Sequence, residues 1–136
     1  MSLLDVGKTE KQLLKKLASF LINDLEVDIL TLPDTSGVMM PMHYYDLISD
    51  SCKANPHGKT RIGVHCHNDL GMANSNSIMG VLGGASAIEV SAFGIGERNG
   101  IGDLFIVGRV LKREGFRIKL NIENVALFKN HSFFRF

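Results

Sequence analysis

A short apolar stretch that ends in two histidines constrains this sequence more than any other feature. Residues 61–67, Arg-Ile-Gly-Val-His-Cys-His, have the length and apolar character of a buried β-strand. Because side chains alternate between the two faces of a strand, His65 and His67 should point to the same side, with Cys66 on the other. Two imidazoles so placed can hold a metal ion at about 2.0–2.1 Å from each nitrogen. Two surface histidines at a strand end are the alternative.

Composition places the chain among ordinary globular proteins. Its 136 residues suffice for one domain, with 45% hydrophobic and 21% charged residues. The net charge is +1 without a basic run, so neither nucleic acid nor an anionic membrane is an expected partner. No apolar stretch approaches about 18 residues and no secretory signal is recognisable, so we expect a cytoplasmic protein. Cys52 and Cys66 are expected to be free thiols.

Helical and strand patterns alternate along the chain. A capping box of Thr9 and Gln12 should open a helix whose apolar face carries Leu13, Leu14, Leu17, Ala18, Leu21, Ile22 and Leu25. Further helices are predicted over 41–54, 72–82 and 102–113, and strands over 27–32, 61–67 and 87–93, with residues 33–37 as a loop. Strands that alternate with helices imply right-handed crossovers and a parallel sheet. The fold class is therefore α/β, a single domain over 1–136 in which the Phe-rich tail 116–136 has no settled role.

The distinctive polar residues all follow predicted strands, at 34–35, 65–69 and 97–99. In parallel α/β proteins, ligands bind at the carboxyl ends of the strands. These three groups therefore predict a metal or substrate site there. Nucleotide binding is not expected: Gly58-Lys59-Thr60 lacks the upstream glycine of a phosphate-binding loop, and the glycines of 94–100 do not have the dinucleotide spacing.

Three motifs together resemble one enzyme family. They are residues 32–37 (Leu-Pro-Asp-Thr-Ser-Gly), 64–75 (Val-His-Cys-His-Asn-Asp-Leu-Gly-Met-Ala-Asn-Ser) and 94–100 (Gly-Ile-Gly-Glu-Arg-Asn-Gly). They resemble the carboxyl-terminal half of the catalytic barrel of isopropylmalate, homocitrate and citramalate synthases, which belong with the hydroxymethylglutaryl-CoA lyase-like TIM barrels. The similarity covers about Asp5 to Gly115. It implies a partial TIM (β/α)8 barrel containing about strands five to seven of eight.

The resemblance also implies a chemistry and a set of site residues. It implies that His65 and His67 bind a divalent metal (Zn, Mg or Mn), and that Thr35 hydrogen-bonds the carboxylate of a 2-oxoacid. It places four further residues around these ligands: Asn68, Asp69, Glu97 and Arg98. The implied reaction is the Claisen-type condensation of acetyl-CoA with the 2-oxoacid, as in amino-acid biosynthesis. Alternatively, Thr35 is a turn residue and Glu97 a surface carboxylate.

Two departures from the family pattern limit these expectations. Ile101 stands where isopropylmalate-like members carry a metal-reaching asparagine, which favours the homocitrate branch. The acidic metal ligand and the Arg-Glu motif of the first strand are absent, so the catalytic residues should lie mainly on strands outside this sequence, and the chain alone should be inactive. Open sheet edges should promote self-association. Two alternatives are a non-catalytic structural or oligomerisation module, and a small metallohydrolase with Asp34 or Glu97 as third ligand.

Overall fold

The computed structural model describes residues 1–123, so most of the Phe-rich tail lies outside the described residues. The predicted alternation of helices and strands is confirmed. The elements are α1 (Lys11–Asn23), β1 (Ile29–Asp34), α2 (Pro41–Lys53), β2 (Arg61–Cys66), α3 (Ala73–Leu82), β3 (Ala87–Glu89), the 3-10 turn η1 (Ala92–Gly94) and α4 (Leu104–Arg113).

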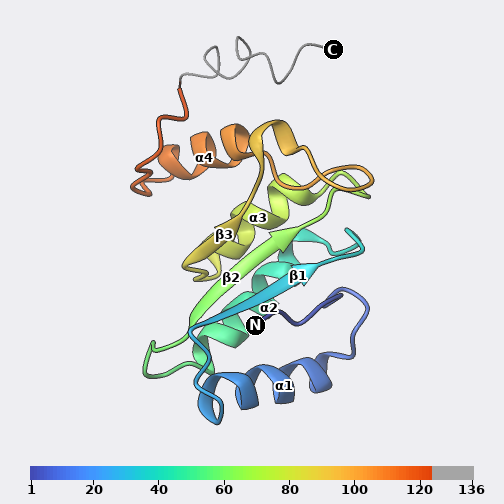
Figure 1. Ribbon diagram of the computed structural model, residues 1–136, viewed down its shortest axis with the longest axis vertical. Helices are drawn as coiled ribbons and strands as arrows, with labels where there is room; N and C mark the ends of the chain where they lie inside the picture. The colour runs from blue at the N-terminus through green and yellow to red at the C-terminus, as the bar shows by residue number, and fades with distance from the viewer. Residues whose placement is uncertain (124–136) are drawn as a thin grey trace.

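The three strands form one parallel sheet in the order β1-β2-β3. In its register, His65 of β2 lies beside Pro33 on one side and Glu89 on the other. The crossovers pass through α2 and α3, which both lie behind the sheet in Figure 1. The predicted α/β class is thus confirmed as an open parallel sheet with flanking helices, which corresponds to part of a TIM-barrel-like fold.

The hydrophobic core lies on one face of this sheet. Leu30, Leu32, Val64 and Cys66 are fully buried there, packed with residues of the helices such as Tyr44. The Tyr44 hydroxyl donates a hydrogen bond of 2.6 Å to the Leu32 carbonyl, so the polar end of this buried ring is satisfied. Alternation then assigns Thr31, Gly63, His65 and Glu89 to the opposite face.

The edge of β1 is covered by the beginning of the chain. Leu3 N–H donates to the Thr31 carbonyl (3.0 Å), and Thr31 N–H donates to the Met1 carbonyl (2.9 Å). Residues 1–6 therefore run beside β1 and pair with it in parallel fashion at Ser2. The expectation that both edges are open is wrong at β1; β3 remains an edge of the three-stranded sheet.

The boundaries of all three strands differ from the sequence prediction: β1 begins two residues late, at Ile29, and β2 ends one residue early, at Cys66. β1 extends through Pro33 and Asp34, predicted as loop, because β2 continues to Cys66 and pairs with them. β3 ends at Glu89 and not at Phe93, because the backbone turns into η1, where Phe93 has φ +60°. Apolar residues continue beyond the strand, and composition alone does not show this turn.

Helix α1 also corrects two expectations. The predicted capping box is absent: Glu10 is the N-cap without a side-chain cap, and the Thr9 hydroxyl donates to the Asp5 carbonyl instead. Only part of the predicted apolar face is buried, namely Leu14, Ala18, Leu21 and Ile22, whereas three leucines of that stripe are exposed: Leu13, Leu17 and Leu25. The apolar stripe is wider than the surface that β1 and α2 offer it.

Candidate metal and substrate site

The two histidines of the central strand converge as predicted. Their Nε2 atoms lie 3.2 Å apart, and the ring centroids are 5.0 Å apart with planes inclined at 61°. Cys66 between them is fully buried on the opposite face, where burial raises the pKa of its thiol to about 12. The period of the strand therefore separates the two imidazoles from the thiol, and only the imidazoles reach the accessible face.

This geometry fits two ligands of one divalent ion. His65 and His67 would hold the ion through their Nε2 atoms, whose separation of 3.2 Å is compatible with metal–nitrogen distances of about 2.0–2.1 Å. Burial lowers the pKa of His67, and the nearby Arg98 and His65 lower it further, which favours the neutral imidazole that a metal requires. Among residues 1–123, however, no group of three His, Cys, Asp or Glu could hold a metal. Further ligands must come from a substrate or from other protein segments.

Thr35 lies in the same pocket as the histidines. This pocket of about 180 Å³ is lined by Ser2, Leu4, Pro33, Thr35, His65, His67 and Glu89. The Thr35 oxygen accepts a hydrogen bond of 2.9 Å from the Asp5 N–H, which leaves its own hydroxyl hydrogen able to donate to a ligand. The structure thus brings together the three residues predicted to bind metal and substrate.

Arg98 ties the three loops at the carboxyl end of the sheet to one another. Its guanidinium donates to both carboxylate oxygens of Asp69 (2.8 and 2.9 Å) and to the Thr35 carbonyl. Asn99 adds a bond to the Asp69 carbonyl. Arg98 holds the pKa of Asp69 below its usual range. The backbone of Arg98 adopts φ +56°, a conformation that is costly for residues other than glycine. The hydrogen bonds of its side chain must therefore compensate for that strain.

Asn68 and Glu97 occupy different positions around the pocket. The Asn68 side-chain oxygen accepts from the Ala73 N–H (3.1 Å) at the first turn of α3, so it orders the start of that helix. Glu97 is exposed in the loop after η1, and its charge acts on His67 in the direction that raises the pKa. Asp69 and Arg98 contact neither imidazole by a hydrogen bond in the part of the chain that is described. They instead position the loops that surround the histidines.

Asp34 does not serve as a third ligand. It is fully buried on the helix-covered side, and its carboxylate accepts from the backbone N–H groups of Val38 (3.1 Å) and Met39 (2.9 Å) and from Asn76 Nδ2 (3.3 Å). Its role is to order the turn after β1. The metallohydrolase alternative, which needs a third ligand from this chain, does not hold for the described residues.

Glu89 is a pocket residue that the sequence analysis missed. Strand register places it beside His65, and its Oε2 lies 3.1 Å from His65 Nδ1. Its other oxygen accepts from the Thr31 hydroxyl at 3.2 Å. A signal was available, because Glu89 is the one charged residue in the apolar stretch 87–93. Only the register, however, shows which residue it faces.

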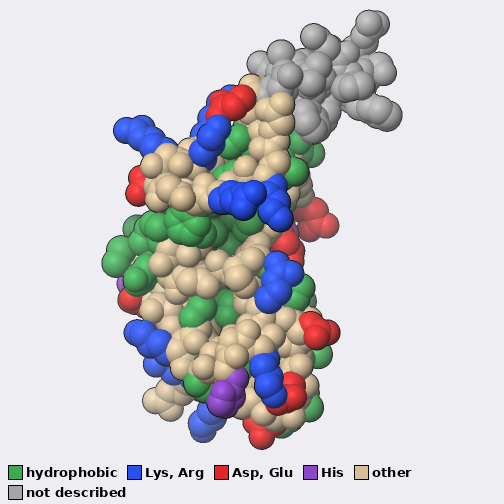
Figure 2. Space-filling model, turned by 90° about the vertical axis from the view of Figure 1, so that its left-hand side faces the viewer, with side chains coloured by type: hydrophobic (Ala, Val, Ile, Leu, Met, Phe, Trp, Pro, Cys, Tyr) green, Lys and Arg blue, Asp and Glu red, His purple; other side chains and the backbone are tan. Residues whose placement is uncertain are grey.

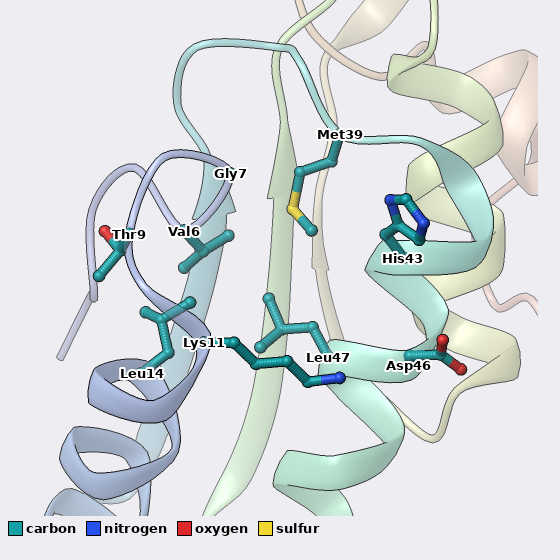
Figure 3. Close-up of a pocket in the computed structure, with 9 residues that line it drawn as sticks. All are labelled: Val6, Gly7, Thr9, Lys11, Leu14, Met39, His43, Asp46 and Leu47. Atoms are coloured by element: carbon teal, nitrogen blue, oxygen red, sulfur yellow. The ribbon is translucent and has the colours of Figure 1, made fainter.

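A larger pocket lies elsewhere, between α1 and α2 (Figure 3). It measures about 250 Å³ and is lined by Val6, Gly7, Thr9, Lys11, Leu14, Met39, His43, Asp46 and Leu47. Four of these, Val6, Leu14, Met39 and Leu47, belong to or pack on the hydrophobic core. The pocket is a gap in helix packing and contains none of the predicted site residues.

No described helix is both long and apolar enough to span a bilayer. On the face shown in Figure 2, Lys and Arg side chains are scattered and interspersed with Asp and Glu. That distribution agrees with the near-zero net charge of the sequence.

Comparison with known proteins decides the family. The sequence profile of the HMGL-like family matches residues 1–131. The chain belongs to the HMGL-like family. The resemblance found in the three motifs is thereby confirmed.

Curated relatives of this HMGL-like chain include synthases of two kinds. A probable 2-isopropylmalate synthase of Archaeoglobus fulgidus is 40% identical over 129 residues, 94% of this chain and 24% of the relative. The homocitrate synthase of Pyrococcus horikoshii is 39% identical over 107 residues, 79% of this chain and 28% of the relative. The chain thus spans about a quarter of the length of these relatives. Its sequence identity to the two is nearly equal, so it does not distinguish the isopropylmalate synthases from the homocitrate synthases.

Solved structures support the HMGL-like fold at lower sequence identity. An HMG-CoA lyase from Acenitobacter baumannii, in complex with coenzyme A and 3-methylmalate, matches with a TM-score of 0.74 and 17% identity, covering 88% of this chain and 40% of that one. Rhizobium etli pyruvate carboxylase matches with a TM-score of 0.76 and 18% identity over 94% of this chain and 12% of that one. At these identities the likeness establishes the fold alone.

Proposed function

We propose that this chain is part of a metal-dependent acyltransferase that condenses acetyl-CoA with a 2-oxoacid, of the 2-isopropylmalate or homocitrate synthase type. The observation that carries the proposal is the pair of facing Nε2 atoms, 3.2 Å apart in one pocket with Thr35, in a chain about 40% identical to such synthases. Neither the pair nor the relatives would suffice alone.

Each pocket residue has a role that its chemistry allows. His65 and His67 would hold the divalent ion, which when bound polarises the keto group of the 2-oxoacid. The Thr35 hydroxyl, whose oxygen is already engaged by Asp5 N–H, would donate to the substrate carboxylate. Asp69 and Arg98 would keep the loop of Thr35 at the correct distance from the histidines.

We also propose that the chain alone is inactive, because two imidazoles leave a catalytic metal centre short of ligands. Catalytic zinc sites usually have three protein ligands, and the described residues supply two. The remaining ligands and the residues that carry the reaction would lie in other segments of the parent enzyme.

Metal binding is the first test. The purified chain is incubated with Zn²⁺, Mn²⁺ or Mg²⁺, desalted, and its metal content measured beside a His65→Ala/His67→Ala variant. A His43→Ala/His57→Ala variant is the matched control, because those two exposed histidines lie outside the pocket that contains His65 and His67. We expect near-stoichiometric metal in the wild type and the control, and loss in the pocket variant.

A turnover assay tests the proposed inactivity of the chain alone. Acetyl-CoA consumption is followed by mass spectrometry with 2-oxoacids of increasing side-chain length. Turnover by the chain alone would overturn its proposed inactivity. Metal retained by the pocket variant would show that His65 and His67 are not its ligands. Metal bound by none of the three proteins would mean that this chain supplies only part of the site, whose remaining ligands lie in other segments. The alternative of a non-catalytic structural or oligomerisation module predicts instead that no 2-oxoacid binds at any metal concentration.

A further inference from the structure

We propose that Glu89 is the positioning residue of the histidine pair: it fixes His65 as the tautomer that presents Nε2 to the metal, and Thr31 holds Glu89 in place. Nothing in the relatives' names assigns a role to either residue. The inference deepens the proposed function and relies on it only for the identity of the ligand as a divalent ion.

The contact between Glu89 and His65 determines which imidazole nitrogen carries the hydrogen. Oε2 of Glu89 lies 3.1 Å from Nδ1 of His65. An ionised carboxylate can only accept hydrogen bonds, so Nδ1 must be the donor. A neutral imidazole with its hydrogen on Nδ1 has its lone pair on Nε2, the atom that faces His67. Metal-binding histidines are commonly oriented by carboxylates in this manner.

Thr31 holds the carboxylate from β1, on the same face of the sheet. Its hydroxyl donates to Glu89 Oε1 at 3.2 Å, although the two residues lie on strands separated by β2. The residue between them is Gly63, which pairs with Thr31 in one register and with Ala87 in the other. A Cβ at Gly63 would lie 2.8 Å from the Thr31 hydroxyl oxygen. The absence of a side chain at Gly63 therefore leaves room for the Thr31–Glu89–His65 row to cross three strands.

His67 has no equivalent support. Its Nδ1 is buried without a hydrogen-bond partner among the described residues. The residue is 8% exposed, and its Nε2 lies 3.2 Å from that of His65. The two ligands thus differ in their support: a hydrogen-bonded row holds His65, whereas His67 is buried and has no carboxylate partner among the described residues. A change at Glu89 should therefore affect His65 and leave His67 in place.

The experiment measures the tautomer of His65 and the metal affinity of the chain separately. Long-range ¹H–¹⁵N spectra of the metal-free full chain at about pH 8, above the usual histidine pKa, report which nitrogen of His65 is protonated. Wild type, Glu89→Ala, Glu89→Gln and Thr31→Val are compared, with Glu114→Ala as control because Glu114 is exposed at the end of α4. Zn²⁺ affinity of the same proteins is measured by competition with a chelating dye.

We expect His65 to be protonated at Nδ1 in the wild type, in Glu114→Ala and in Glu89→Gln, whose amide oxygen can still accept. Glu89→Ala should lose this preference and bind Zn²⁺ about 10–100-fold more weakly, with a smaller loss in Glu89→Gln and Thr31→Val. The partial rescue by glutamine distinguishes positioning from a general loss of structure.

Two results would overturn the inference: protonation of His65 at Nε2 in the wild type, or a Glu89→Ala variant with unchanged His65 signals and unchanged Zn²⁺ affinity. If the wild type binds no Zn²⁺ but Glu89→Ala changes the tautomer, the metal-dependent function fails while the positioning role stands. The two failures are therefore distinguishable.

Discussion

The two faces of β2 differ in what their residues do. Val64 and Cys66 point toward α2 and α3 and are fully buried. His65 points the other way, its side chain is 24% exposed, and it lines a pocket with Thr35 and Glu89. Adjacent residues of one strand thus serve stability and binding in turn.

This difference shows how a small parallel sheet can carry a polar site without weakening its core. The main hydrophobic core lies on the helix-covered face, so the other face can hold imidazoles, a hydroxyl and a carboxylate. Substitutions on the covered face should therefore change stability, and substitutions on the accessible face should change binding. Four experiments test this separation.

The largest effect is expected from Leu32→Ala on the covered face. Leu32 is fully buried, so its truncation leaves a cavity and should lower the free energy of unfolding by about 2–5 kcal/mol. Leu4→Ala is the matched control, because Leu4 is 69% exposed at the accessible-face pocket and should cost less than about 0.5 kcal/mol. Urea denaturation measures both. Equal losses would mean that the two faces do not differ as described.

Asp34→Ala should have the next largest effect on stability and none on metal uptake. The substitution leaves the N–H groups of Val38 and Met39 without their acceptor, at a cost of about 1–3 kcal/mol. Because the carboxylate lies on the covered side, the folded variant should retain the metal content of the wild type. Loss of metal without loss of stability would identify Asp34 as a ligand and contradict the assignment.

The Asp69–Arg98 pair should give a pH-dependent contribution to stability. The Arg98 guanidinium lowers the pKa of Asp69 in the folded chain, so the ionised pair stabilises the fold above the unfolded pKa of about 3.9. That contribution is lost as the pH falls through the lowered folded pKa. Wild type should therefore exceed Asp69→Asn in stability at neutral pH, with the difference shrinking toward acid.

Arg98→Ala provides the second arm of this experiment. In its background, Asp69→Asn should no longer produce a pH-dependent difference, because the guanidinium that lowers the pKa is gone. Thermal unfolding between neutral pH and about pH 3 measures all four proteins. A difference that persists without Arg98 would assign the pKa shift to another group.

The smallest effect concerns the thiols and requires no substitution. Burial raises the pKa of the Cys66 thiol to about 12. Burial also raises the pKa of the Cys52 thiol, but Cys52 is only half-buried and therefore accessible to a reagent. Iodoacetamide near pH 8 should label Cys52 slowly and Cys66 only after unfolding. Peptide mass spectrometry distinguishes them. Rapid labelling of Cys66 in the folded chain would mean that the covered face opens.

Local patterns in the sequence predicted the order of helices and strands and the side to which the histidines point. The reason is that a strand alternates with a period of two whatever its neighbours are, so His65 in β2 and His67, one residue past its end, point to the same side. Thr35 joined them because parallel strands place their carboxyl ends at one edge of the sheet.

Other features depended on contacts between residues far apart in the chain. Glu89 meets His65 only through the register of β2 and β3, and Arg98 reaches Asp69 and Thr35 only when three loops lie together. The left-handed backbone of Arg98 is likewise invisible in its residue type. Residues 1–6 were not predicted as a partner of β1. The predicted Thr9 cap was wrong because the helix begins one residue later, with Glu10 at the N-cap, and the Thr9 hydroxyl donates to the Asp5 carbonyl.

The sequence by itself therefore determined the α/β class, the family and the pair of imidazoles, because period and motif are local properties of the chain. Only the tertiary structure decided which carboxylate supports the pair: Asp34 accepts backbone N–H groups under the helices, while Glu89 contacts His65 on the accessible face. The physical reason is that a carboxylate's role depends on the donors that surround it, and those donors come from segments that the fold brings together.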